Sequence, residues 1–122
     1  MLSLNTIMIG TEEVKPLRDF YTKLLGEPGW DDEGFVGWQA GSGMIMIGAH
    51  SEVKGRNEMP GRIILNFETT DVKKEFERIK GLGATVVQEP YPPSESMPDF
   101  LLATFADPDG NYFQLATPMP AQ

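Results

Sequence analysis

The sequence contains no cysteine and only one histidine among 122 residues. The absence of thiols excludes a disulfide framework and a cysteine nucleophile, and it fits a reducing compartment. No apolar run approaches the roughly 20 residues that a membrane span needs, and the start, Met1 to Thr6, lacks the basic and apolar regions of a signal peptide. We therefore expect a soluble, cytoplasmic protein that makes no contact with a membrane.

Basic side chains are also scarce: 10 Lys and Arg face 18 Asp and Glu, which gives a formal net charge of −8. Binding to a phosphate backbone depends on clustered basic residues, so nucleic acid is not an expected partner. The surplus carboxylates are interpreted first as solubilising surface. Attraction of a cationic ligand is the second interpretation.

Sequence motifs of covalent or phosphate chemistry are missing as well. The serines lie in predicted loops without a nucleophile elbow, and Gly41-Ser42-Gly43 lacks the lysine and the helix start of a phosphate-binding loop. His50 follows a predicted strand at the entrance to a polar segment. We interpret this isolated imidazole as a solvated or linker-packing side chain in preference to a general base.

Hydrophobic periodicity predicts the same order of elements twice. Apolar residues alternate in the expected strands and recur at three- and four-residue spacing in the expected helices, with Gly26 and Gly81 or Gly83 as helix stops and Asp71 or Thr70 as a cap. A further strand near Trp30 is left open. In the first half we expect strands at 4–10, 35–39 and 44–49 and a helix at 14–25, and in the second half strands at 62–69, 84–88, 100–106 and 111–116 and a helix from 71 to about 80.

This repetition predicts an α+β fold built from two βαβββ modules. A chain of this length suits one domain. We assign residues 1–122 to a single domain, with module one at 1–50, a linker at 51–61, module two at 62–117 and a tail at 118–122.

The segment from Phe105 to Leu115 has the pattern Phe-x-Asp-Pro-Asp-Gly-Asn-x-Phe-x-Leu, which predicts two strands joined by a tight turn. The pattern resembles the closing hairpin of the vicinal-oxygen-chelate superfamily, which includes glyoxalase I, bleomycin-resistance proteins and extradiol dioxygenases. The stretches Asp19–Gly26 and Glu77–Gly83 are similar to helix signatures of that superfamily. The resemblance implies curved, mostly antiparallel sheets around a cup, and it implies a homodimer.

Metal-dependent members of the superfamily hold their ion with two ligands from each module. Matched by position, these ligands fall on Thr6 and Met46 in module one and on Ile64 and Gln114 in module two. None of these side chains offers the carboxylate, imidazole or thiolate that a divalent metal prefers. The resemblance therefore implies a metal-free member without a cofactor.

Strand alternation divides each sheet into two faces. The more uniformly aliphatic and aromatic faces, which include Ile45, Ile63 and Phe113, are expected to pack under the helices. The other faces, which carry the four positions matched to the superfamily, mix methionine and tyrosine with a few polar groups. The aromatic rings of Trp30, Phe35, Trp38 and Phe100 are candidates for the rim, although core burial is at least as strong an interpretation for either tryptophan. The expected ligand-binding residues are Thr6, Met8, Trp38, Met44, Met46, Arg62, Ile64, Asn66, Phe100, Tyr112 and Gln114.

A cup of this composition predicts binding of a small hydrophobic or planar molecule, since such pockets have apolar walls and sparse orienting polar groups. The leading hypothesis is a metal-independent binding protein of the glyoxalase/bleomycin-resistance type, with antibiotic sequestration and resistance as one form of that function. The alternative is a lyase, isomerase or dioxygenase-like enzyme that acts on a small metabolite in the same cup. A regulatory or structural dimer is the third class.

Overall fold

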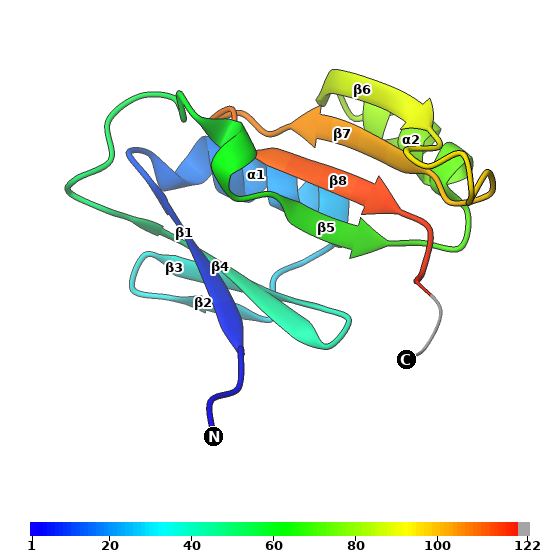
Figure 1. Ribbon diagram of the computed structural model, residues 1–122. Coiled ribbons are helices and arrows are strands. Elements are labelled where there is room, and N and C mark those ends of the chain that lie inside the picture. The colour runs from blue at the N-terminus through cyan, green and yellow to red at the C-terminus, as the bar shows by residue number, and fades with distance from the viewer. Residues whose placement is uncertain (120–122) are drawn as a thin grey trace. The chain divides into compact units, whose positions relative to one another are not determined.

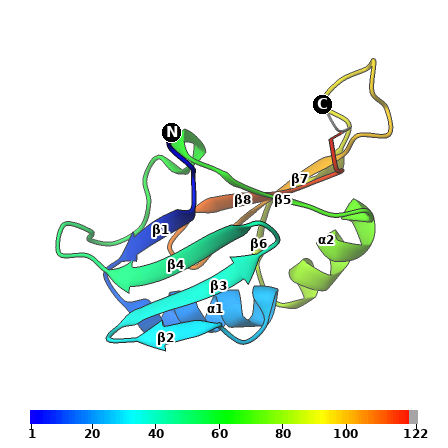
Figure 2. The ribbon, with the colours of Figure 1, turned by 90° about the horizontal axis from the view of Figure 1, so that it is seen from below.

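The computed structural model describes residues 1–119, and the chain divides into two compact units at Gly55 and Arg56. In each unit one helix packs on a four-stranded sheet (Figures 1 and 2). The boundary falls within the segment predicted as a linker. None of the helices within residues 1–119 is long and apolar enough to cross a membrane.

Module one contains a sheet with strand order β1-β4-β3-β2. The outer strand β1 runs parallel to β4, and the two other strand pairs are antiparallel. The further strand that the sequence left open near Trp30 is present as β2. The elements are β1 (Thr6–Thr11), α1 (Val14–Leu25), β2 (Trp30–Asp32), β3 (Phe35–Ala40) and β4 (Gly43–Ala49).

Module two repeats this arrangement with strand order β5-β8-β7-β6, in which only β5 and β8 are parallel. The predicted α+β fold of two βαβββ modules is confirmed, and each sheet is mixed. The elements are a short 3-10 turn η1 (Pro60–Arg62), β5 (Leu65–Glu68), α2 (Val72–Gly81), β6 (Thr85–Tyr91), β7 (Leu102–Ala106) and β8 (Tyr112–Ala116).

The helix ends follow from local residue chemistry. Gly26 ends α1 with φ of 97°, a left-handed conformation that glycine adopts without strain, and its N–H donates to the Thr22 carbonyl at 2.8 Å. Asp71 caps α2, because its carboxylate accepts a hydrogen bond from the Lys74 backbone N–H at 3.1 Å. The C-terminal end of α1 and the N-terminal end of α2 therefore lie where the sequence predicts them.

Each helix buries its apolar stripe against its own sheet. In module one, Leu17, Tyr21 and Leu24 of α1 are buried, as are Ile45 and Ile47 of β4. Burial of such aliphatic side chains contributes about 1.5–3 kcal/mol each. These contacts occupy one face of the module-one sheet and leave its other face open.

Module two has an aromatic core. The Phe76 ring of α2 stacks on Phe105 of β7 at a centroid distance of 5.1 Å, and Phe105 stacks on Phe113 of β8 at 5.4 Å. All three side chains are almost completely buried. The predicted packing of Phe113 under the helix is confirmed.

The predicted hairpin is held by the buried carboxylate of Asp107. It accepts hydrogen bonds from the backbone N–H groups of Asp109 and Asn111 at 2.9 and 3.0 Å and from the Asn111 side-chain amide at 3.0 Å. Asn57 and Arg56 also bond to this turn, through Asn111 and the Pro108 carbonyl. The part of the predicted linker that begins at Arg56 therefore belongs to module two.

Two strand boundaries, the start of β5 and the end of β6, each differ from the prediction by three residues. The strand predicted at 62–69 begins only at Leu65, because Pro60 starts a 3-10 turn that runs through Arg62, and Ile63 is 74% exposed instead of packing under the helix. The strand predicted at 84–88 extends to Tyr91. It includes Pro90, which is tolerated because β6 is an edge strand with irregular register.

Candidate functional site: an apolar hollow on module one

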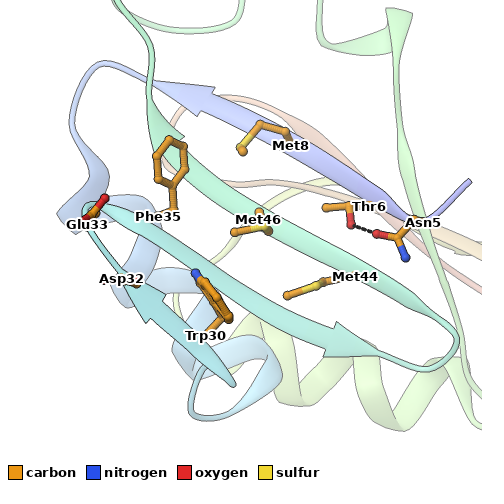
Figure 3. Close-up of a pocket in the computed structure, with 9 residues that line it drawn as sticks. All are labelled: Asn5, Thr6, Met8, Trp30, Asp32, Glu33, Phe35, Met44 and Met46. Carbon is orange, nitrogen blue, oxygen red and sulfur yellow. Dashed lines mark hydrogen bonds between the residues drawn. The ribbon is translucent and has the colours of Figure 1, made fainter.

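The open face of the module-one sheet carries a hollow of about 510 Å³ (Figure 3). Its walls are mostly apolar, and three methionines and two aromatic rings share the same side of the sheet. The residues that line it are Asn5, Thr6, Met8, Trp30, Asp32, Glu33, Phe35, Met44 and Met46.

Strand register explains why these side chains converge. Thr6 of β1 lies beside Met44 of β4, and Met8 lies beside Met46. Met46 in turn faces Gly37 of β3, which faces Trp30 of β2. A continuous row therefore crosses all four strands, from Met8 on one edge to Trp30 on the other.

Two glycines make room for the side chains around them. A Cβ atom on Gly37 would lie 2.8 Å from the Met44 terminal methyl carbon and 3.2 Å from Met46 Cγ. A Cβ atom on Gly48 would lie 2.5 Å from Cδ1 of the Phe35 ring. The Phe35 ring can lie over β4 only because Gly48 has no side chain.

The aromatic rings of the hollow remain substantially exposed. Trp30 is 51% exposed and Phe35 is 41% exposed, and Met8 on the opposite edge strand is 52% exposed. Water therefore reaches an apolar surface that could be covered by a bound molecule.

Polar groups lie at two ends of the hollow. The Thr6 hydroxyl donates to the side-chain oxygen of Asn5, and Asp32 and Glu33 lie at the β2–β3 turn (Figure 3). Glu33 has φ of 50° and Gly34 has φ of 85°, so the two-residue turn uses left-handed conformations at both positions. This turn places the Glu33 carboxylate at the rim.

The structure brings four of the predicted ligand-binding residues together in the hollow: Thr6, Met8, Met44 and Met46. The predicted rim position of Trp38 is wrong. Trp38 is 2% exposed, its ring packs near Tyr21, and its indole N–H donates to the Gly26 carbonyl at 2.8 Å. Alternation along β3 turns Trp38 toward α1, so the alternative of core burial is the correct one.

The predicted residues of module two lie outside this hollow. Gln114 of β8 lies beside Asn66 of β5, and its side-chain amide donates to the Thr104 hydroxyl at 3.0 Å. Tyr112 shares the face of Gln114 by strand alternation, and Ile64 is half-buried immediately before β5.

The predicted strand positions of two further module-two residues, Arg62 and Phe100, are wrong. Arg62 belongs to η1 and not to a strand, so it is not in step with Asn66, and its guanidinium lies 3.6 Å from the Met59 sulfur. Phe100 is half-buried in the loop before β7, where its N–H donates to the Met97 carbonyl. Neither residue belongs to a strand of the module-two sheet.

The prediction of ligand-binding residues missed several members of the hollow. Trp30 and Phe35 were candidates for the rim, but Asn5, Asp32 and Glu33 were not identified. Alternation along β2 places Trp30 and Asp32 on one face. The signal for Glu33 was the two-residue spacing between Asp32 and Phe35, which is typical of a tight hairpin turn.

The sequence profile of the glyoxalase-like domain matches residues 6–116. The chain belongs to the glyoxalase-like domain family. No protein of curated function matched the sequence. This membership agrees with the resemblance that the Asp107–Asn111 turn and the helix signatures carry.

Solved structures similar to this glyoxalase-like chain support the fold. A glyoxalase-related enzyme from Fulvimarina pelagi is 20% identical, with a TM-score of 0.76 and coverage of 99% of this chain and 94% of that one. A glyoxalase/bleomycin resistance protein/dioxygenase family enzyme from Burkholderia phytofirmans is 22% identical, with a TM-score of 0.76 and coverage of 97% and 100%. A glyoxalase/bleomycin resistance protein from Albidiferax ferrireducens is 19% identical, with a TM-score of 0.72 and coverage of 93% and 98%.

The donor set of this glyoxalase-like chain does not fit a metal ion. Thr6 and Met46 stand on the module-one strands, and Ile64 and Gln114 stand at or near the corresponding strands of module two. Within residues 1–119 no three His, Asp or Glu side chains gather where they could hold an ion. These four side chains therefore lack the charge and basicity that a divalent metal requires.

The single histidine lies apart from the hollow lining. His50 follows β4 directly, and its Nδ1 atom accepts a hydrogen bond from the Glu52 backbone N–H at 3.1 Å. The imidazole is exposed, and its bond supports the local chain turn.

Proposed function

We propose that this member of the glyoxalase-like family is a metal-independent binding protein for a small hydrophobic or planar molecule. The observation that carries the proposal is the apolar hollow of about 510 Å³ on module one. Its size falls within the roughly 300–1,000 Å³ that is typical of small-molecule pockets. Sequestration of an antibiotic would be one use of such binding.

The physical basis of affinity would be the removal of apolar surface from water. Covering the Trp30 and Phe35 rings and the Met8 side chain yields about 25 cal/mol for each Å² of apolar area buried. Methionine side chains adapt to irregular shapes, which suits a site that accepts related planar compounds. The polar Asn5 and Thr6 pair would orient a ligand at one end.

The two tryptophans allow a direct test by fluorescence. Trp30 is exposed in the hollow, whereas Trp38 is buried in the core. We expect a planar hydrophobic compound, selected by thermal shift from antibiotics and small metabolites, to quench Trp30 emission saturably. The Trp30→Phe variant should lose the quenching while Trp38 continues to report a folded protein.

A matched pair of methionine variants controls for general surface effects. Met8→Ala should weaken binding several-fold, because it removes apolar wall from the hollow. Met59→Ala removes a side chain that is similarly exposed, at 61%, but lies outside the hollow, and it should leave affinity unchanged. Equal effects of the two variants, unaltered quenching in Trp30→Phe, or conversion of the compound into a product would contradict the proposal.

A further inference from the structure

We infer that the ligand of the module-one hollow is an organic cation, with a positive group held beside Asp32 and Glu33 and a ring held against Trp30 and Phe35. This inference rests on the proposed function, because it assigns a ligand class to the same site. The hollow, with its volume and apolar walls, constitutes the binding site. The two carboxylates decide which charge it accepts.

The charges around the hollow are all of one sign. Among the described residues that line it, only Asp32 and Glu33 are ionisable, and the other polar members, Asn5 and Thr6, are neutral. No lysine, arginine or histidine is found among these lining residues. An anionic ligand would therefore meet like charges without a compensating cation.

Neighbouring acidic residues illustrate the difference between the two faces of β2. On the helix side, Asp31 pairs with Arg18 of α1. On the hollow side, Asp32 enters no ion pair among the described residues, and neither does Glu33 at the turn. The positive partner that Asp31 finds within the chain is thus missing where the sheet faces the hollow.

Aromatic faces and carboxylates favour the same kind of ligand. A cation over the face of Trp or Phe is attracted by the electrons of the ring, and this attraction grows when the site excludes water. The carboxylates at the β2–β3 turn would add a Coulomb attraction. The net charge of −8 also favours the approach of a cation over that of an anion.

Three probes with the same ring system separate charge from shape: 1-naphthylmethylammonium, 1-naphthylmethanol and 1-naphthylacetate. We expect calorimetric titration at low salt to rank the cation first, the alcohol second and the anion last. The advantage of the cation over the alcohol should be about two- to tenfold, since exposed ion pairs and cation–π contacts are individually modest. It should shrink as salt is added.

The variants Asp32→Asn and Glu33→Asn remove the two charges while keeping side chains of similar shape or turn preference. Asparagine tolerates the left-handed conformation of residue 33 better than glutamate does. The double variant should lose the carboxylate contribution, so the advantage of the cation over the alcohol should fall to the part that the aromatic rings supply. Glu77→Gln on α2 changes the net charge by one without touching the hollow, and it should preserve the preference for the cation.

The outcomes distinguish the two proposals. If the wild-type protein bound all three probes with equal affinity, and each probe quenched Trp30 emission, the cation inference would be overturned and the proposed function would stand. Binding of none of the probes would overturn both. Concentration-dependent self-association that buries Trp30 and is not reversed by the cation would overturn both as well, because a second copy would then occupy the hollow.

Discussion

Among single residues, Gly37 and Gly48 set the depth of the hollow through the side chains that they lack. A methyl group on either would meet a neighbour at less than 3.0 Å, but the neighbours differ. At Gly37 the close atom is the flexible end of Met44. At Gly48 it is the ring of Phe35, which must move as a rigid unit. Ring position and pocket shape therefore depend most strongly on Gly48.

Gly48→Ala is expected to displace the Phe35 ring and to weaken ligand binding at least fivefold, with a loss of about 1–3 kcal/mol in stability if the ring cannot swing outward. Gly43→Ala on the same strand is the matched control, because its Cβ would meet only the Ala40 carbonyl oxygen at 3.9 Å. Titration and thermal unfolding of both variants measure the two effects. Unchanged affinity in Gly48→Ala would show that Phe35 does not shape the bound state.

At the scale of elements, tight turns determine where strand residues point. The Glu33-Gly34 turn brings Asp32 opposite Phe35, and the Asp107–Gly110 turn brings Ala106 opposite Tyr112. In the second turn, one buried carboxylate satisfies two backbone N–H groups and an amide. That hydrogen bonding gives the Asp-Pro-Asp-Gly-Asn motif a structural role.

Asp107→Ala should destabilise the protein by about 2–3 kcal/mol, because it leaves part-buried backbone donors without their charged acceptor. Asp107→Asn should recover part of this loss, since an amide oxygen can still accept a bond. Asp109→Asn serves as the comparison, because Asp109 is only half-buried and the substitution keeps the backbone N–H that donates to Asp107. Denaturant unfolding measures all three, and an equal loss in the two Asn variants would contradict the assigned role of Asp107.

At the scale of the whole molecule, the hollow belongs to one module. Its lining residues run from Asn5 to Met46, within the unit that ends at Gly55. The candidate polar residues of module two, Asn66 and Gln114, stand on a separate sheet. The sequence predicted one cup lined by both modules. The two arrangements differ in which backbone amides a bound ligand would protect from hydrogen exchange.

Hydrogen exchange, measured with and without bound 1-naphthylmethylammonium, tests whether the ligand contacts one module or both. We expect added protection at β1, β2, β3 and β4 (Thr6–Thr11 and residues 30–49) and none at β5 or β8. Residues on those four strands cover or flank the hollow, so the bound probe should reduce their local opening. Protection at Asn66 or Gln114 would instead show that both modules contact the ligand.

Much of the fold was predictable because its determinants are local. Gly26 ends α1, Asp71 caps α2, and the motif from Asp107 to Asn111 forms its turn through contacts within a few residues. The start of β5 was less predictable, because Pro60 initiates a 3-10 turn in a segment whose apolar alternation continues through Ile64. The extension of β6 past Pro90 depends on its place at the sheet edge.

The site was predictable where the family resemblance and the alternation of one strand were sufficient. Thr6 and Met46 were identified by their match to the ligand positions of the superfamily, and Met8 and Met44 because period-two alternation places them on the same face. Trp38 was mispredicted, because it alternates in step with Val36 on β3 and both side chains are buried on the helix side of the sheet. The positions of Asp32 and Glu33 were not predicted, because they depend on β2, a three-residue strand that residue propensity alone left open.

The sequence by itself determined the repeated element order, the helix ends and the closing turn, because each depends on residue type and short-range spacing. Only the tertiary structure decided that Trp30, Phe35 and three methionines meet above Gly37 and Gly48. That meeting requires the pairing of four strands in the order β1-β4-β3-β2. Strand order brings distant segments into register, so no local pattern specifies the hollow.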